Sequence, residues 1–358
     1  MIIFLTITAV FLLIATCLPM TNIRHWCVRD FDFPRVQLAF LAYLTLAIDL
    51  IYSPESSLYY WSITLSLLFC ALWQTAWILP YTPLWKKEVH SVHEYEKSLK
   101  ILTSNVLQTN HNSEALLKLV KQEQPDILVT LESNQWWEDQ LKEIEAFMPY
   151  TVKCPLENLY GMHLYSKLPL SNTELQFLVE DDVPSIHTAI HLDDKHTIET
   201  HFVHPAPPSP TENETSKERE IELLLLAKAL QDSKNPIIVT GDLNDVAWSK
   251  TTRQFRALSK LLDPRIGRGM FNTFHASYPF LRWPLDHLFH SKHFKLVEMR
   301  RLPSIGSDHF PLLTHLAYAP DAKQEQDDIE VDQDDFEETK ELFKEGNVST
   351  QDIPELKH

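Results

Sequence analysis

The sequence predicts an α/β protein in which a sandwich of mixed β-sheets, flanked by helices, follows three transmembrane helices. Three observations lead to this fold class. Apolar residues crowd into positions 1–80, short strand-like runs alternate with amphipathic helices over positions 100–318, and acidic residues crowd into positions 319–358. Because strands dominate and helices intervene irregularly in the middle region, a mixed-sheet sandwich suits the pattern.

The N-terminal region contains three apolar runs, at about residues 2–19, 36–52 and 58–79. Each approaches the ~20 residues that a helix needs to cross a bilayer. The first run lacks the basic segment and the cleavage site of a signal peptide, which is the alternative for that run. Buried core helices are the alternative for the other two, but short polar loops between runs of this length favour membrane spans. We expect a membrane region at 1–80, followed by a linker at 81–99.

Basic residues predict how the spans are oriented. The loop between the first two runs carries three arginines (Arg24, Arg29 and Arg35), whereas the loop between the second and third carries only Glu55. Two lysines, Lys86 and Lys87, follow the third run. Because basic loops tend to stay cytoplasmic, we expect an integral protein of a bacterial inner membrane with its soluble domain in the cytoplasm. The opposite orientation stays open.

Composition argues against several classes of function. The formal net charge of −17 disfavours a generally basic nucleic-acid-binding surface. The four cysteines form no CxxC pair, so neither a zinc site nor a disulfide framework is indicated. The six glycines form no glycine-rich phosphate loop. We expect the acidic tail, residues 319–358, to be solvated and disordered; a tail that competes for a metal or binds a partner is the alternative.

Five short motifs occur in order along residues 100–318: TSNV, QPDILVTLE, HPAPP, GDLND, and the pair PLDH and GSDHFPL. Most of them place polar side chains at the end of a strand or in the turn that follows it. These side chains are Asn105, Glu132, His204, Asp242, Asn244, Asp286, Asp308 and His309. Each motif is weak by itself, but a chance match of all five in this order is improbable.

At these motifs the sequence resembles the endonuclease/exonuclease/phosphatase superfamily, which includes pancreatic deoxyribonuclease, sphingomyelinases and inositol-polyphosphate 5-phosphatases. The resemblance covers about residues 100–318 and implies a four-layer sandwich of two mixed β-sheets flanked by helices. It also implies phosphoester hydrolysis, which requires a hard cation, a base that activates water, and donors for the phosphoryl oxygens. Because Mg²⁺ prefers oxygen ligands and keeps several waters, a few carboxylates and an amide suffice to hold Mg²⁺ or Mn²⁺.

The resemblance also implies a role for each polar residue. The expected metal ligands are Asn105, Glu132 and Asp308. Asp242 matches the residue that activates or orients the attacking water, and Asn244 the one that holds the phosphate or the nucleophile beside it. Asp286 is expected to orient His309, which contacts the scissile phosphate and stabilises the transition state. His204 is expected to be a phosphate contact or general acid.

These residues also have structural alternatives. A Gly-Asp-x-Asn turn is an ordinary strand exit, and His287 in the PLDH motif is expected to be structural. His201 lies three residues before His204 on the same strand, so alternation puts the two on opposite faces and only one can point into a site. The Pro-Ala-Pro-Pro segment after His204 favours His204. Lys167 and Arg282 are weaker candidates, for scaffolding the site and for meeting a substrate phosphate.

Three functions are compatible with these patterns. The first is a nuclease-type phosphodiesterase, although Arg265, Arg268 and Arg282 make only a modest basic set for a nucleic-acid groove. The alternative is a hydrolase of phospholipid or phosphoinositide headgroups, which membrane tethering would bring near the site. A catalytically inactive membrane interaction protein is the remote third, because no expected catalytic residue is missing. No obligate protein partner is expected.

Overall fold

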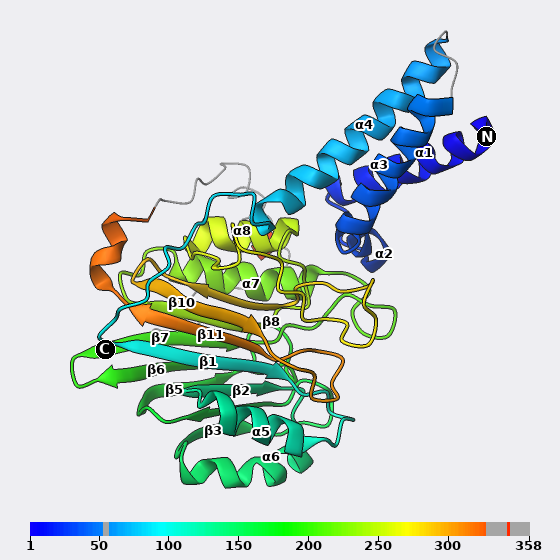
Figure 1. Ribbon diagram of the computed structural model, residues 1–358. Helices are drawn as coiled ribbons and strands as arrows, with labels where there is room; N and C mark the ends of the chain where they lie inside the picture. Colours follow the sequence, from blue (N-terminus) through cyan, green and yellow to red (C-terminus); the bar gives the residue numbers. More distant parts are fainter. Residues whose placement is uncertain (53–56, 327–341, 344–358) are drawn as a thin grey trace.

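The computed structural model describes residues 1–52, 57–326 and 342–343 of the 358-residue chain. Three long helices form a bundle that projects from one corner of a larger α/β domain (Figure 1). Most of the predicted acidic tail lies outside the described residues. Its first part, Pro320–Gln324, forms a 3₁₀ helix, and Gln326 donates from Nε2 to the carbonyls of Lys292 and Phe294.

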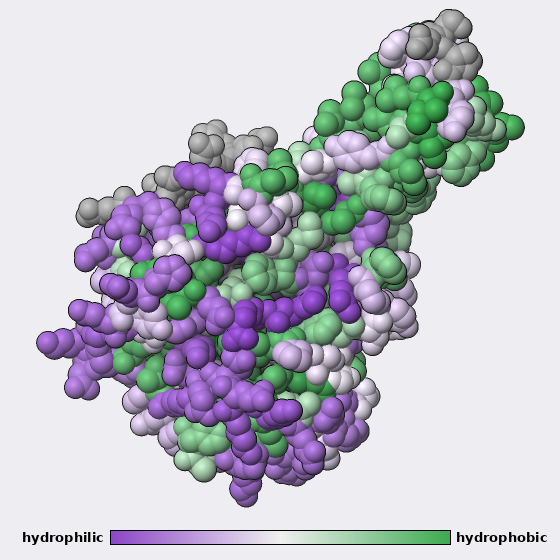
Figure 2. All heavy atoms as spheres, in the orientation of Figure 1, coloured by the Kyte–Doolittle hydropathy of each residue, from purple (hydrophilic) through white to green (hydrophobic). Residues whose placement is uncertain are grey.

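All three helices of the bundle are long and apolar enough to cross a membrane, as the sequence predicts: α1 (Ile2–Cys17), α3 (Arg35–Tyr52) and α4 (Leu58–Ile78). Large apolar side chains such as Phe40 and Leu65 are exposed on the outside of the bundle, whereas small residues such as Ala42 and Ala71 pack inside it. Figure 2 shows this apolar surface as a region distinct from the polar α/β domain. Apolar exteriors with small residues between helices are typical of bundles in lipid.

A short segment links α1 to α3 at the end of the bundle nearest the domain. It contains a 3₁₀ turn at Leu18–Met20, helix α2 (Trp26–Arg29) and a second 3₁₀ turn at Asp30–Asp32. Helix α4 ends at the same place in the turn Leu79–Tyr81. The N terminus and the end of α3 lie at the opposite, far end of the bundle (Figure 1).

The α/β domain contains two mixed sheets. The six-stranded sheet has the order β10-β11-β1-β2-β4-β3, with bounds Phe294–Arg301, Leu312–Tyr318, Ser98–Asn105, Ile127–Leu131, Met162–Ser166 and Tyr150–Cys154. The five-stranded sheet has the order β5-β6-β7-β8-β9, with bounds Leu170–Gln176, Ser185–Asp193, His196–Val203, Ile237–Asp242 and Asp286–His290. In each sheet one neighbouring pair is parallel, β1 with β2 and β7 with β8.

Helices cover both outer faces and complete the predicted four-layer sandwich. Helices α5 (Ser113–Glu123) and α6 (Gln135–Leu141), with a 3₁₀ turn at Lys142–Ala146, flank the six-stranded sheet, and α7 (Lys217–Leu230) and α8 (Lys250–Ser259) flank the other (Figure 1). Apolar side chains from both sheets, such as Val129 and Phe202, fill the core between them. Alternating strands therefore bury one face in the centre and the other under the helices.

Strand direction brings the ends of several strands together at one edge of the sandwich. Parallel β1 and β2 end side by side, and β11 runs antiparallel to β1, so the loop before β11 lies at the same edge. In the other sheet β9 is antiparallel to β8 and begins where β8 ends, with Asp286 opposite Asp242. The polar residues that follow these strands therefore meet at one place, although they are far apart in the sequence.

Candidate active site

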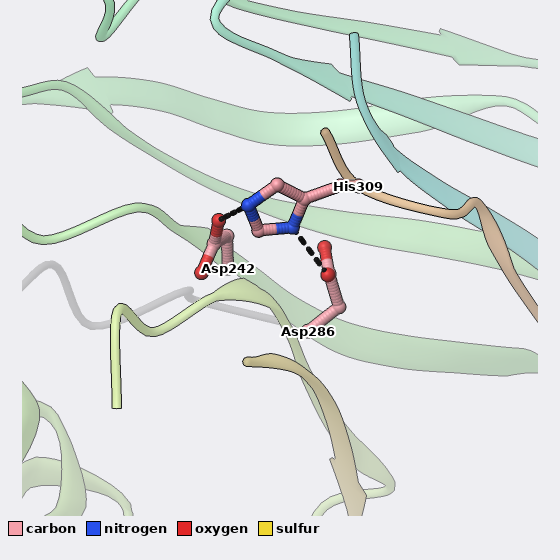
Figure 3. A group of neighbouring side chains, drawn as sticks. All are labelled: Asp242, Asp286 and His309. Carbon is pink, nitrogen blue, oxygen red and sulfur yellow. Dashed lines mark hydrogen bonds and ion pairs between the residues drawn. The ribbon is translucent and has the colours of Figure 1, made fainter. Parts of the chain in front are cut away.

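Three buried side chains form the centre of the site. His309, in the loop before β11, lies between Asp286 at the start of β9 and Asp242 at the end of β8 (Figure 3). Its Nδ1 is 2.8 Å from Asp286 Oδ2, and its Nε2 is 3.4 Å from Asp242 Oδ2. Burial opposes protonation of this imidazole, but the two carboxylates raise the pKa of His309 to about 10. His309 is therefore an imidazolium held in a fixed orientation.

Glycine is required immediately before Asp242. Gly241 has a φ of +155°, and a Cβ at this position would lie 1.8 Å from the carbonyl oxygen of Val203 on the neighbouring strand. Close backbone approach of β7 and β8 therefore accounts for the glycine of the GDLND motif. It also brings the end of β7, and with it His204, next to Asp242.

Asn105 connects the two sheets through its side chain. Its Nδ2 donates to Glu132 Oε1 at 2.7 Å and to Asp242 Oδ2 at 3.1 Å, and its Oδ1 accepts from the Leu107 amide. In this arrangement Asn105 holds two carboxylates together and presents no oxygen toward Glu132. Its expected role as a direct metal ligand stays a prediction, and the geometry favours an orienting role.

Glu132 fits a bound cation. It follows β2 in a left-handed conformation, with a φ of 57°. Its Oε2 is buried and has no hydrogen-bond partner among the residues that the structure describes. Burial raises the pKa of Glu132 to about 7, and the negative charges of Asp308 and Asp242 act in the same direction. A cation at Oε2 would offset this cost, and carboxylate oxygens are ligands that Mg²⁺ or Mn²⁺ prefers.

Asp242, Asp286 and His309 offer a second group of possible ligand atoms, all within 4.8 Å of one another. Both ring nitrogens of His309 face carboxylates in that group, and an imidazolium has no lone pair for a metal. We therefore favour the Glu132 side of the pocket, where Asp308 also lies. The Asp-His-Asp array is better suited to orienting charge and protons than to holding the ion.

His204 lies in the site and His201 does not. His204 Nε2 is 4.0 Å from Asp242 Oδ2, its ring lies beside Tyr160, and burial lowers its pKa to about 4. His201 belongs to a separate buried network, with its Nδ1 2.7 Å from His187 Nδ1 and its Nε2 3.3 Å from Glu199 Oε1. The two histidines point to opposite faces, as strand alternation predicts.

Replacement of His204 by alanine is expected to lower turnover at least about tenfold, because positioned acid–base or phosphate-contacting groups typically contribute 10²-fold or more. Replacement of His201 by alanine is expected to change turnover less than His204→Ala, once any loss of folded protein is corrected for by thermal unfolding. Steady-state kinetics of both purified variants test this order. A larger loss of turnover in His201→Ala would contradict the assignment of strand faces.

Asn244 and a residue that the sequence did not single out form the wall next to Asp242. Asn244, with a φ of 50°, donates its backbone N–H to Asp242 Oδ1 at 3.0 Å and its Nδ2 to the Pro205 carbonyl at 3.1 Å. Arg219 on α7 is buried, donates to the Asn244 carbonyl, and lies 3.3 Å from Asp245. Arg219 thereby fixes the turn that follows β8. No motif in the sequence predicted this role of Arg219.

The weaker candidates lie elsewhere. Lys167 follows β4 beside the start of β2, so it is at the opposite end of the sheet from Glu132, and the scaffolding role suggested for it is wrong. Arg282 donates to the carbonyls of His275 and Ala276 instead of lining the pocket. His287 is structural as expected, with Nδ1 2.7 Å from Arg265 Nη2 and Nε2 2.9 Å from the Asp245 carbonyl.

The site residues surround a cavity of about 300 Å³. Five of the eight predicted side chains line it: Glu132, His204, Asn244, Asp308 and His309. Asn105, Asp242 and Asp286 lie behind them and contact them directly. Further lining residues that the sequence did not indicate include Tyr160, Glu212 and, from the segment between α1 and α3, Asp30 and Phe33. An ionised aspartate (Asp242), an imidazolium (His309) and a glutamate that could bind a cation (Glu132) form an arrangement suited to phosphoester hydrolysis.

Residues 102–309 match the model of the Endonuclease/Exonuclease/phosphatase family, and the chain belongs to this family. A search of curated proteins finds no match. Among solved structures, an endonuclease/exonuclease/phosphatase from Beutenbergia cavernae DSM 12333 is 16% identical, with a TM-score of 0.52 over 63% of this chain and 72% of that one.

Two further neighbours share the fold at a similar level. The human Nocturnin catalytic domain with bound sulfate anion is 16% identical, with a TM-score of 0.51 over 63% of this chain and 97% of that one. D. rerio TDP2 complexed with a single-strand DNA product is 13% identical, with a TM-score of 0.52 over 62% of this chain and 99% of that one. At these identities the likeness concerns the fold alone.

Proposed function

We propose that this protein is a membrane-anchored, metal-dependent phosphoesterase that hydrolyses phosphodiesters with a water activated at Asp242. The observation that carries the proposal is that His309, held between Asp242 and Asp286, lines the same cavity as Glu132, whose Oε2 has no hydrogen-bond partner among the described residues. When bound at Glu132 and Asp308, Mg²⁺ or Mn²⁺ would supply positive charge to the phosphoryl oxygens.

The other residues perform the remaining steps of hydrolysis. Burial opposes ionisation of Asp242, but His309 and His204 lower its pKa, so the carboxylate is ionised and accepts a proton from the attacking water. The water oxygen forms a bond to phosphorus, and the bond from phosphorus to the leaving oxygen breaks. His309 stabilises the charge that develops on the phosphoryl group, and Asp286 holds its ring in place. Because burial lowers the pKa of His204 to about 4, its ring is neutral, which favours a contact with a phosphoryl oxygen over the general-acid role. The leaving oxygen then takes its proton from water.

Two substrate classes carry the phosphodiester that this reaction needs. Nucleic acid is supported by the fold shared with a TDP2 that was solved with a DNA product. A lipid headgroup is supported by the three candidate membrane helices and by the participation of Asp30 and Phe33 in the pocket. An inactive interaction protein has little support, since all eight predicted site residues lie in the cavity or in contact with residues that line it.

A substrate panel tests the proposed reaction. The full chain, purified in detergent with Mg²⁺, would be assayed on bis(p-nitrophenyl) phosphate, single-stranded DNA, RNA, phospholipids and inositol phosphates. We expect hydrolysis of the generic diester and of at least one natural class, and no hydrolysis by Asp242→Asn. Equal background rates for both proteins on every substrate would contradict the proposal.

We further propose that the α/β domain faces the cytoplasm of a bacterial inner membrane. The segment between α1 and α3 lies at the same end of the bundle as the α/β domain (Figure 1). This segment carries Arg24 and Arg29 and leads to Arg35, the first residue of α3. Because basic loops tend to stay cytoplasmic, the segment and the domain are both expected in the cytoplasm. In a bacterial host, a fluorescent protein fused to the C terminus is expected to fluoresce, and alkaline phosphatase fused there to stay inactive. Active alkaline phosphatase would show that the α/β domain faces away from the cytoplasm.

A further inference from the structure

The segment between α1 and α3 forms part of the wall of the active-site cavity. Asp30 and Phe33 line the cavity together with Glu132 and His309. Phe33 precedes Arg35, the first residue of α3, by two positions, a distance of at most about 7 Å along the chain. The cavity is therefore beside the end of a membrane span, and its lining is incomplete without the membrane region.

Several contacts hold this segment against the α/β domain. Trp248 Nε1 donates to the Asp32 carbonyl at 2.8 Å in a buried position, and Arg24 Nε lies 2.9 Å from Glu220 Oε2. The rings of Phe33 and Trp283 meet edge to face, with centroids 5.6 Å apart. The cavity and the membrane bundle are thus fixed to each other through buried hydrogen bonds, ion pairs and apolar contacts.

A second feature lies beside the same end of the bundle. The loop of residues 278–281 exposes three apolar side chains: Tyr278 is 57% exposed, Phe280 88% and Leu281 48%. The Phe280 carbonyl accepts a hydrogen bond of 2.7 Å from Gln37 Nε2, in the first turn of α3. The first turn of a spanning helix lies at the depth of the lipid headgroups, where aromatic side chains are favoured. Water would be an unfavourable environment for Phe280.

The loop is continuous with the cavity. Its flanking residue Phe274 lines the cavity, and the backbone of Phe274 pairs with that of Trp283 and with that of His309. The guanidinium groups of Arg35 and Arg253 lie 4.5 and 4.3 Å from the ring centroid of Trp77, near the end of α4. Paired tryptophan and arginine are typical of a bilayer interface.

Building on the proposed phosphoesterase function, we propose that residues 278–281 enter the bilayer interface and that the cavity takes the phosphodiester headgroup of a lipid from that bilayer. The lining holds four carboxylates (Asp30, Glu132, Glu212 and Asp308) and two cationic groups (Arg219 and His309), so acidic side chains outnumber basic ones. This charge disfavours a polyanion that carries a phosphate on every nucleotide, whereas a single headgroup phosphate is balanced by one cation and His309.

The step is an ordinary hydrolysis. Water adds across one of the two phosphorus–oxygen ester bonds of the lipid. Cleavage on the glycerol side gives diacylglycerol and a phosphorylated headgroup, and cleavage on the headgroup side gives phosphatidic acid and the free headgroup alcohol. The leaving oxygen ends as a hydroxyl with the proton that water supplies. No oxidant or second substrate is needed.

The test uses the full chain reconstituted in vesicles of phosphatidylethanolamine and phosphatidylglycerol with Mg²⁺. Lipid products are measured by mass spectrometry, and hydrolysis of soluble bis(p-nitrophenyl) phosphate is measured in the same vesicles. The variant Phe280→Asp is compared with Tyr150→Asp, which changes an aromatic residue of 40% exposure on β3, an edge strand of the six-stranded sheet. Neither residue lines the cavity.

We expect wild type to release lipid products and Phe280→Asp to do so at least about tenfold more slowly, because a charge is unfavourable at interface depth. The soluble diester rate should change less than about twofold in both variants, as for most surface substitutions, and Tyr150→Asp should retain lipid hydrolysis. Hydrolysis of soluble bis(p-nitrophenyl) phosphate without release of any lipid product would overturn this inference and leave the proposed function standing. Equal lipid rates in both variants would overturn the role of residues 278–281. Hydrolysis of no diester at all would overturn both proposals.

Discussion

Replacement of Asp242 by asparagine is expected to lower the turnover of any phosphodiester substrate by about 10³-fold or more while the fold is retained. Asp242 is buried, accepts hydrogen bonds from the Asn244 backbone and the Asn105 side chain, and faces His309. Asparagine keeps the shape but cannot accept a proton from water or balance the imidazolium. Loss of one preorganised group that acts on the transition state typically costs 10²–10³-fold in rate, and loss of proton transfer adds to that.

His309→Ala is the companion variant for this prediction. It removes the charge that lies between Asp242 and Asp286, and a turnover loss of the same order is expected. Asp286→Asn should be milder, because it leaves the imidazole present and alters only its orientation and pKa. Thermal unfolding serves as the control for folding in each variant. An active Asp242→Asn enzyme, with turnover within about threefold of wild type, would remove Asp242 from the mechanism.

Replacement of Glu132 by glutamine is expected to have the next largest effect. The buried Oε2 of Glu132 has no partner within the described part of the chain, and the residue has lost most of its contact with water. If a cation completes this site, glutamine should raise the Mg²⁺ concentration for half-maximal activity at least about tenfold, since even residues outside the ligand shell change metal affinity 10–100-fold. Turnover at saturating Mg²⁺ should recover in part.

Glu132→Gln is expected to weaken Mg²⁺ binding but not to destabilise the metal-free protein. Glutamine keeps an oxygen that can accept from Asn105 and removes the charge of a carboxylate whose Oε2 has no partner among the described residues, so the free energy of unfolding should stay unchanged or rise. Unfolding in the presence of a chelator measures this. A Glu132→Gln protein with unaltered Mg²⁺ dependence would place the cation elsewhere, and the Asp242–Asp286–His309 group would then be the alternative site.

Local patterns in the sequence were sufficient for the fold class and for the ends of the site-bearing strands. Apolar runs predicted α1, α3 and α4, and the five motifs placed polar residues at the ends of strands that do converge. Period-two alternation also separated His204 from His201. These inferences succeeded because each depends on contacts between near neighbours or on strand geometry, which a sequence expresses directly.

Contacts between segments that are distant in the chain could not be predicted from the sequence. Helices α3 and α4 separate Asp30 and Phe33 from β1, the first sheet strand, yet both residues line the cavity. Arg219 lies in a helix with no recognisable motif, and its partner at Asn244 becomes visible only when α7 packs on the five-stranded sheet. Lys167 was misplaced because a strand-and-turn pattern does not say which end of the sheet the turn occupies. The Asn105 amide orientation likewise depends on the neighbouring carboxylates.

The central claim, a phosphodiester hydrolase that requires a divalent cation, is tested most directly by metal depletion. Hydrolysis of bis(p-nitrophenyl) phosphate by the purified full chain is followed in excess chelator and then after addition of Mg²⁺ or Mn²⁺, with Asp242→Asn measured in parallel. Because the candidate ligands are oxygen atoms, activity should vanish in chelator and return with either ion, and the variant should stay inactive throughout. Full activity in excess chelator would contradict the account, whichever natural phosphodiester the protein meets.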